Sequence, residues 1–371
     1  MILEAPMLDF IEFFEEVEDP RANNSLHDLV EVLFIALLAT LSGATSCSDM
    51  AEFGRVKERL LRTVLDLKHG TPSHDTFSRV FRLIPPKPFE KAFARFMKAF
   101  GEGLAKTRGT PNVIAIDGKA LKGAYETGLS HSPRMIVEAW GAQTRMVLAS
   151  VAAPDRDETQ AAQELLDLVQ LKGAIVTGDA LHCNRAMVDK IVENGGDYVL
   201  ALKANQSALY PDAVALIDAK GGRMPRAKTQ EYGHGRKETR AAVVVPAEAL
   251  GVKHSFPGLA AVARVVSRRG KDDPVTRYFI CSKPYAPDEL IKIVRTHWTI
   301  ENGLHWVLDV VLDEDQARNR KDNGPENLAI IKRLALNVAR AHPDQKTPMR
   351  RKLRHAGWDE AYLFELLAHV R

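Results

Sequence analysis

Three acidic residues of this 371-residue chain stand where they could hold divalent metal ions. Asp117 follows the apolar run VIAI, Asp179 follows IVTG, and Glu301 lies within RTHWTIENGLHWVLDVVLDED. Two ions held roughly 3.5–4 Å apart by carboxylates can activate a water or hydroxyl and stabilise the leaving oxygen of a phosphodiester. Because hard cations take oxygen ligands, three acids without a thiolate predict two Mg²⁺ (or Mn²⁺) ions and not zinc.

The two aspartates need a sheet to bring them together. NVIAID and AIVTGD are predicted as short buried strands, each ending in its aspartate. In an open α/β sheet, ligands bind at the carboxyl ends of the strands, so neighbouring strands would place both carboxylates at one edge. Gly118 would allow a tight turn after Asp117. The alternative is that each aspartate only caps a turn, which is common at strand ends.

The third acid needs a rigid helix. Glu301, His305 and Asp309 follow one another at intervals of four residues, so they share one face of the predicted helix. Leu304, Val307, Leu308 and Val311 form an apolar stripe that could pack on the sheet. A helical glutamate is usually solvated, but two tryptophans, Trp298 and Trp306, are unusual on a solvated face.

The order of the predicted elements indicates an α/β fold with an all-helical start. Residues 8–100 are predicted as helices, and from Pro111 the order is strand, strand, strand, helix, strand, helix, strand. This is the order of the ribonuclease H-like fold, a mixed sheet with helices on both faces. We predict a helical domain at 1–108, a catalytic domain at 109–371, and a mainly β insertion at about 205–284.

Charge is nearly balanced overall but gathers in segments. The net charge is +3, yet basic residues gather at 220–240, 264–271 and 349–355. Separate basic segments on a balanced chain indicate a protein that binds a polyanion at several places. The alternative is that each segment is a solvated face. Lys119 and Lys122 could hold a phosphate backbone. His234 and Arg236, in GHGRKETR, are further candidates for DNA contact, with a glycine hairpin turn as the alternative.

The remaining composition points to a cytoplasmic protein. Three cysteines far apart predict neither a zinc site nor a disulfide framework. The start, MILEAPMLDFIEFFEE, is acidic where a signal peptide is basic, and the most apolar stretch is too short to span a bilayer. We expect no membrane role and a cytoplasmic location in association with the nucleoid.

Several long motifs carry a resemblance to a known family. They are HGTPSHDTFSRVF (69–81), AIDGKALKGA (115–124), VTGDALHCN (176–184), DYVLALKANQ (197–206), EYGHGRKETR (231–240), RTHWTIENGLHWVLDVVLDEDQAR (295–318) and NLAIIKRLALN (327–337). From about Leu8 to its C-terminal end, the chain resembles the DDE transposases of bacterial insertion sequences, in the branch called H-repeat-associated proteins.

The resemblance implies a ribonuclease H-like fold and a metal site formed by Asp117, Asp179 and Glu301. It implies DNA as the partner, both as terminal inverted repeats and as target, with a homodimer in the DNA complex because two element ends must meet. Within the third motif we add four residues to the expected DNA contacts: Arg295, His297, His305 and Arg318.

The chain departs from the broader superfamily in that third motif. Val294, His297 and Leu308 stand where Tyr, Arg and Lys are usual, and Asn184 stands where Gln is usual. His297 is therefore expected to take over part of the phosphate contact of the arginine.

Three functions fit these residues. The first is an active transposase that cleaves element ends and joins the freed 3′ hydroxyl to target DNA. The second is a metal-dependent nuclease that cuts without joining. The third is a catalytically inactive, transposase-derived DNA-binding protein. Three converging negative charges favour catalysis, because they add nothing to the binding of a polyanion.

Overall fold

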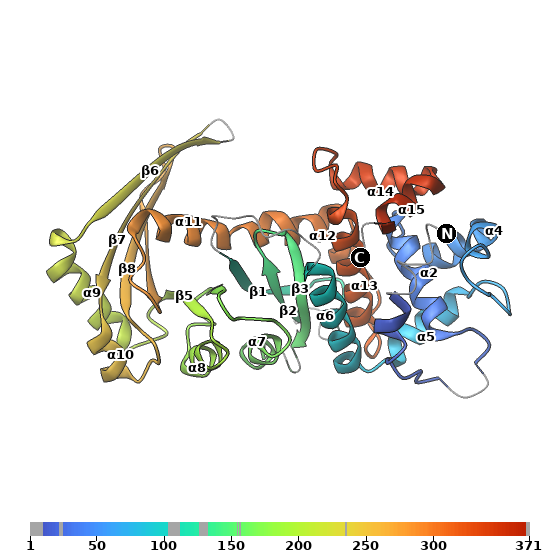
Figure 1. The fold of residues 1–371 in the computed structure, drawn as a ribbon, viewed down its shortest axis with the longest axis horizontal. Helices are drawn as coiled ribbons and strands as arrows, with labels where there is room; N and C mark the ends of the chain where they lie inside the picture. Colours follow the sequence, from blue (N-terminus) through green and yellow to red (C-terminus); the bar gives the residue numbers. More distant parts are fainter. Residues whose placement is uncertain are drawn as a thin grey trace.

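The molecule is elongated, with a twisted sheet that extends from its middle to one end and a helical body at the other end (Figure 1). This computed structural model describes residues 10–21, 25–102, 112–125, 133–153, 155, 157–233 and 236–368. No helix within these ranges is both long and apolar enough to cross a membrane.

The sheet has nine strands in the described part of the chain, in the order β3-β2-β1-β4-β5-β9-β8-β7-β6. The first five strands are β1 (Val113–Leu121), β2 (Arg134–Gly141), β3 (Met146–Ala153), β4 (Ile175–Gly178) and β5 (Asp197–Leu202). β1, β2 and β3 pair antiparallel, whereas β1, β4 and β5 run parallel. The predicted α/β class with a large mixed sheet is therefore confirmed.

The inserted segment continues this sheet. It contributes β6 (Arg226–Gly233), β7 (Arg236–Pro246), β8 (Ala261–Arg269) and β9 (Val275–Cys281), and β9 pairs with β5. The sequence predicted three of these strands. It missed β6 and the two helices of the segment, α9 (Leu209–Lys220) and α10 (Glu248–His254).

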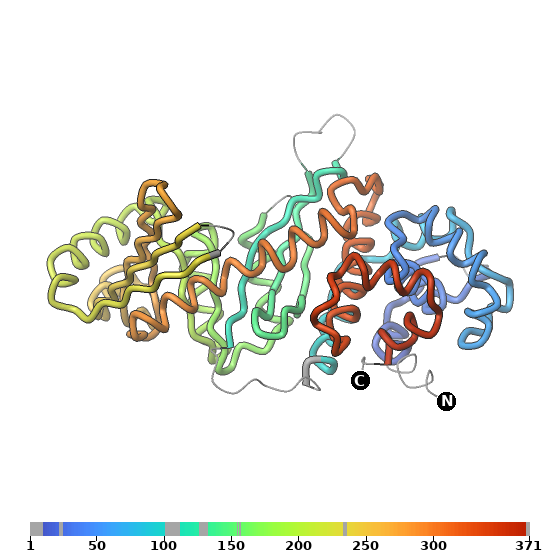
Figure 2. Tube along the Cα trace, turned by 90° about the horizontal axis from the view of Figure 1, so that it is seen from above, coloured from blue at the N-terminus to red at the C-terminus, as the bar shows by residue number. Residues whose placement is uncertain are grey.

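Apolar side chains of β1 point alternately to the two faces of the sheet, so both faces are apolar. Helices cover each of them. Ile114 and Ile116 share one core with α7 (Glu158–Leu166), α8 (Arg185–Glu193) and α9. Val113 packs on the other face with α11 (Pro287–His297), and Ala115 packs there with α12 (Trp306–Val310). Figure 2 shows α11 and α12 running across the sheet as one long diagonal element.

The helical body is built from both ends of the chain. Its N-terminal helices are α2 (Leu29–Leu41), α3 (Cys47–Val56), α4 (Glu58–Leu61), α5 (His74–Leu83) and α6 (Pro86–Glu102). Its C-terminal helices are α13 (Gly324–Ala341), α14 (Met349–Trp358) and α15 (Glu360–Ala368). One continuous apolar core contains residues of both sets, among them Leu33, Phe81, Leu334 and Leu363. The C-terminal helices thus complete a core that the N-terminal helices begin.

Candidate active site

Asp117 lies inside a strand and not at its end, which corrects the sequence prediction. β1 continues to Leu121, and Asp117 stands opposite Glu138 of β2. Gly118 therefore makes no turn. Instead it leaves room for Glu158, since a Cβ atom at Gly118 would lie 2.3 Å from a Glu158 carboxylate oxygen. The antiparallel partner β2 keeps β1 extended beyond the point where its parallel partner stops.

Asp179 lies beside Asp117 in the sheet. The parallel pairing of β1 with β4 ends at Ile116 and Gly178, and the two aspartates are the next residues. Asp179 is exposed, and its carboxylate accepts hydrogen bonds from the backbone N–H groups of Leu181 (2.8 Å) and His182 (3.4 Å). Asp179 therefore caps a turn and also lines the cavity that contains Asp117, so the capping role does not exclude a functional one.

Glu301 is presented by a π-helical turn, Glu301–His305, between α11 and α12. Such wide turns occur mostly as single interruptions of α-helices and are frequent at functional sites. The turn packs on Trp140, since a Cβ atom at Gly303 would lie 2.9 Å from the indole ring. Arg340 donates to the carbonyl oxygen of Gly303 and lies over the same ring. These contacts fix the place of Glu301 against the sheet.

The carboxylates converge with His305 on one point. His305 Nδ1 lies 3.5 Å from Glu301 Oε2 and 3.9 Å from Asp117 Oδ2. One donor atom from each of these three residues lies within 4.8 Å of the others, so the group could hold a metal ion. Asp117, Asp179 and Glu301 also line a common cavity of about 370 Å³ together with His297. The structure thus brings the three predicted acids to one cavity.

The negative charges gathered around Asp117 favour the binding of a cation. Burial raises the pKa of Asp117 to about 7, and the negative charges of Glu301 and Asp179 add to this, while His305 opposes it. A hydrogen bond from His305 lowers the pKa of Glu301. Burial and the charge of Asp179 raise the pKa of Glu158, a fourth acid that the sequence analysis missed. A bound positive ion would favour the charged forms of Asp117 and Glu158, whose pKa values are raised.

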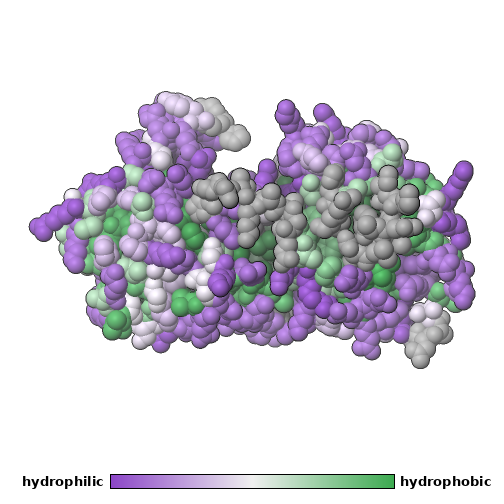
Figure 3. Space-filling model, in the orientation of Figure 1, coloured by the Kyte–Doolittle hydropathy of each residue, from purple (hydrophilic) through white to green (hydrophobic). Residues whose placement is uncertain are grey.

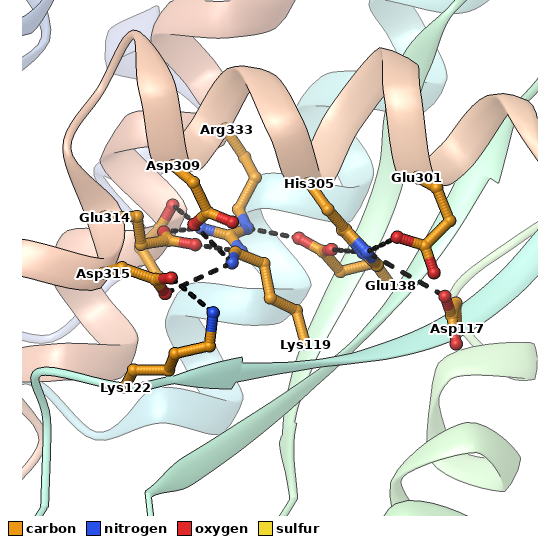
Figure 4. Close-up of polar contacts among 11 residues, drawn as sticks. Asp117, Lys119, Lys122, Glu138, Glu301, His305, Asp309, Glu314, Asp315 and Arg333 are labelled. Carbon is orange, nitrogen blue, oxygen red and sulfur yellow. Dashed lines mark hydrogen bonds and ion pairs between the residues drawn. The ribbon is translucent and has the colours of Figure 1, made fainter.

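A buried chain of charges lies behind His305 (Figure 4). His305 Nε2 lies 3.0 Å from Glu138 Oε2, Arg333 donates to Glu138, and Arg333 also forms two hydrogen bonds with Glu314. Glu138 and Arg333 are fully buried. Although burial alone would raise the pKa of Glu138, Arg333 and His305 lower it to about 2. Although burial alone would lower the pKa of His305, its carboxylate partners raise it to about 9.

The sequence analysis did not find this chain, although two signals were present. Glu138 interrupts the apolar strand MIVEAW, and Arg333 interrupts the apolar helix NLAIIKRLALN. A charge inside an apolar run of an element expected to be buried indicates an ion pair, because charged residues are almost never fully buried unless paired.

The lysines expected to hold phosphate are paired with acids. Lys119 is buried, with its Nζ 2.5 Å from Asp309 Oδ1 and 3.6 Å from Asp315 Oδ1. Lys122 is exposed, with its Nζ 2.7 Å from Asp315 Oδ2. These two lysines therefore join the end of β1 to α12 and to the segment after it, and of the two only Lys122 offers an exposed side chain.

The other predicted DNA contacts are spread over the surface and the cavity. Arg236 and Arg318 are exposed, and His234 lies outside the described residues. Arg295 is exposed and pairs with Glu231 of β6. His297 lies 3.0 Å, through Nδ1, from the hydroxyl of Thr177, and burial lowers its pKa to about 4. His297 therefore lines the cavity as a neutral side chain.

Comparison with known proteins places the chain in a family. Residues 108–338 match the family described as "Transposase DDE domain", and residues 11–97 match the family described as "DDE_Tnp_1-associated". The chain therefore belongs to the DDE-domain transposases.

Two relatives from Escherichia coli match nearly the whole chain. The H repeat-associated putative transposase YhhI of strain K12 is 31% identical over 355 residues, covering 92% of this chain and 93% of its own. The protein named "Putative transposase YncI" of O157:H7 is 33% identical over 378 residues, covering 98% and 94%. The chain is also similar to the solved piggyBac transposase synaptic complex with hairpin DNA, at 13% identity, with a TM-score of 0.44 and coverage of 96% of this chain and 80% of that one.

Proposed function

We propose that this protein is an insertion-sequence transposase that hydrolyses a DNA strand at each element end and joins the freed 3′ hydroxyl to target DNA. The observation that carries the proposal is the convergence of Asp117, Asp179 and Glu301 on one cavity, from two neighbouring strands and the π-helical turn. In this proposal these three residues are the catalytic acids.

The donor set fits divalent cations of the hard kind. Asp117 and Glu301 offer carboxylate oxygens within 4.8 Å of each other, and Asp179 faces the same cavity. We assign two Mg²⁺ or Mn²⁺ ions to these residues; when bound, they would activate the attacking oxygen and stabilise the leaving one. The three acids would hold and space the ions, while the cavity walls orient the phosphodiester between them.

The strand order supports a ribonuclease H-like catalytic fold. Strands β3-β2-β1 are antiparallel, and β4 and β5 continue parallel to β1, with helices on both faces. This is the mixed sheet that the sequence predicted for the fold. We propose a catalytic domain at 109–371, with the inserted strands extending its sheet, and a transposase-associated helical domain at 1–108, whose apolar core α13, α14 and α15 of the catalytic domain complete.

An arginine-lined hollow beside the cavity supports DNA as the partner. It measures about 800 Å³ and extends from α11 to the hairpin of β6 and β7. Its charged lining consists of six arginines, Arg145, Arg240, Arg268, Arg269, Arg277 and Arg295, and four acids, Glu231, Glu238, Asp272 and Asp273. Figure 3 shows a mainly hydrophilic face whose upper edge is hollowed between that hairpin and the helices α14 and α15. Phosphate contacts from such arginines would position DNA without reading its sequence.

One contact makes this hollow suited to a nucleic acid and not only to phosphate. Arg277 lies 5.3 Å from the ring centroid of Trp298, whose side chain is half exposed, and both residues also line the catalytic cavity. Aromatic rings and guanidinium planes offer stacking surfaces to bases. We infer that DNA, as terminal inverted repeats and then as target, is held here, with a homodimer bringing the two ends together at the nucleoid.

The test compares variants of the three acids with a variant of an exposed acid, Asp288, on the helix that precedes Glu301. Asp117→Asn, Asp179→Asn and Glu301→Gln should each abolish Mg²⁺- or Mn²⁺-dependent cleavage of terminal inverted-repeat DNA. Asp288→Asn, at an exposed acid in the first turn of α11, should cut like the parent. Parental cutting by any of the three variants would contradict the assignment.

A two-DNA assay separates the alternatives. Joined products identify a transposase, and cutting without joining identifies a nuclease. DNA binding with neither product would identify a catalytically inactive DNA-binding protein.

A further inference from the structure

The two ring nitrogens of His305 face different surroundings. His305 is 7% exposed, and its Nε2 lies 3.0 Å from Glu138 Oε2. Because its other oxygen accepts a hydrogen bond from the guanidinium of Arg333, Glu138 is a carboxylate that can only accept, and the proton of this hydrogen bond belongs to Nε2. The other nitrogen, Nδ1, faces Glu301 Oε2 at 3.5 Å and Asp117 Oδ2 at 3.9 Å.

Glu138 cannot rotate away from this contact. Its second oxygen accepts from Arg333, whose guanidinium also binds both oxygens of Glu314, and all three side chains are buried. Figure 4 shows the resulting line of side chains, from Glu314 through Arg333 and Glu138 to His305 and the two acids. The orientation of the His305 imidazole ring is therefore fixed by Glu138.

Stability alone does not account for this arrangement. A buried ion pair often contributes no more than apolar residues of the same volume would. A carboxylate behind an imidazole is, however, the usual partner of a metal-binding histidine, because it fixes the tautomer and makes the ligand nitrogen more basic.

We infer that His305 is a metal ligand: its Nδ1 completes, with Asp117 and Glu301, the coordination of one of the cations, and Glu138 is its positioning residue. The inference deepens the proposed function and rests on it. The spacing agrees, because bonds of about 2.1 Å place donors on opposite sides of an ion about 4.2 Å apart, and these three donors lie within 4.8 Å. Binding releases any proton on Nδ1 to solvent, as metal binding to a histidine requires.

A nitrogen donor changes which cation the site prefers. Mg²⁺ takes oxygen ligands almost exclusively, whereas imidazole favours transition metals. The site should therefore bind Mn²⁺ more tightly than Mg²⁺, and His305→Gln should reduce the affinity for Mn²⁺ more than the affinity for Mg²⁺.

The test uses Mn²⁺ as a spectroscopic probe in the full-length protein, and no activity measurement is needed. Electron spin echo spectroscopy of bound Mn²⁺ should show coupling to a histidine nitrogen. Labelling the histidines with ¹⁵N should shift that coupling. This measurement is made on the parent chain, so it does not depend on whether a variant folds.

Three variants assign the nitrogen. His305→Gln should lose the coupling while retaining weakened Mn²⁺ binding. His297→Gln is the matched control, since His297 lines the same cavity but turns its Nδ1 to Thr177, and it should keep the coupling. Glu138→Gln should weaken Mn²⁺ binding roughly 10- to 100-fold, as is typical when the group that orients a ligand is changed.

The outcomes separate this inference from the proposed function. Bound Mn²⁺ without nitrogen coupling in the parent, or coupling that persists in folded His305→Gln, overturns the role of His305 and leaves the three acids in place. A parent chain that binds no Mn²⁺ overturns both.

Discussion

The protein has two strongly charged regions that differ in how their charges are satisfied. Behind the cavity that Asp117 and Glu301 line, Glu138 and Glu314 are buried and both pair with buried Arg333. In the arginine-lined hollow the charges are partly solvated: Arg240, Arg269 and Arg295 pair with Glu231 or Glu238, and Arg277 contacts a hydroxyl group and an indole ring. Charge removed from the first region should therefore cost stability and geometry. Charge removed from the second should cost mainly affinity for a polyanion.

The largest expected change in stability comes from a substitution in the first region, the buried ion pairs. Arg333→Met leaves Glu138 and Glu314 buried without their cation, which should lower the free energy of unfolding by about 3–5 kcal/mol. Urea denaturation measures it. Arg295→Met, at an exposed pair with Glu231, is the control and should change stability by less than about 1 kcal/mol. Equal losses in both variants would remove the distinction between the two regions.

The next effect concerns the cavity itself and depends on pH. The pKa of Asp117 is raised from 3.8 to about 7, so the folded state keeps a proton that the unfolded state releases between these values. Stability conferred by the protonated acid is complete below pH 4 and is lost as the pH rises through 7. In chelator, Asp117→Asn should therefore be more stable than the parent by about 2–4 kcal/mol at pH 8, at about 1.4 kcal/mol per pKa unit.

Denaturation at pH 4 and pH 8 tests whether the stability advantage of Asp117→Asn appears only at the higher pH. The two proteins should converge at the lower pH, and added Mn²⁺ should stabilise the parent more than the variant at the higher one. An advantage of the variant that stays the same at both pH values would show that Asp117 does not titrate as described.

A smaller effect on stability is expected at Gly303, in the π-helical turn. Gly303 lines the arginine-lined hollow, but it also packs on buried Trp140. Gly303→Ala places a methyl group against the ring and should cost about 1–3 kcal/mol, as overpacking does. Gly222→Ala, where a Cβ atom meets nothing within 4 Å, is the control for the glycine-to-alanine change. A fully stable Gly303→Ala would mean that the π-helical turn shifts freely on the sheet.

The smallest effect on stability is expected in the arginine-lined hollow. Arg277→Met should lower the free energy of unfolding by about 1 kcal/mol or less, because it removes one hydrogen bond and one partly exposed contact with an indole ring. It should weaken DNA binding and reduce the slope of log affinity against log salt by about one, as the loss of one phosphate contact does. Fluorescence anisotropy across a salt series measures this. An unchanged slope would take Arg277 out of the DNA contacts.

The sequence predicted the strands and the helix that carry the acids because those features are local, whereas the convergence of the acids was expected from neighbouring strands and from the family resemblance. The strands around Asp117 and Asp179 are short apolar runs, and the helix opened by Pro287 carries an apolar stripe toward the sheet. The roles of the three acids remain predictions, whereas their common cavity is observed.

The features that sequence could not supply depend on partners far along the chain. β1 passes through Asp117 because β2 pairs with it, and no residue near Asp117 encodes that pairing. The π-helical turn at Glu301 depends on packing against Trp140, some 160 residues earlier in the chain (301 − 140 = 161). Glu138 and Arg333 each looked like an isolated charge, and only the fold shows that they compensate one another.

The shared core of the two chain ends has a consequence for damaged copies of the gene. Helices α2 to α6 are made early in synthesis, but apolar side chains such as Leu33 and Phe81 share their core with α13, α14 and α15. A premature stop codon before residue 324 would leave those side chains exposed to water, and such a fragment should aggregate or be degraded. Truncated copies of the element should therefore yield no stable N-terminal fragment able to compete with the intact protein for DNA.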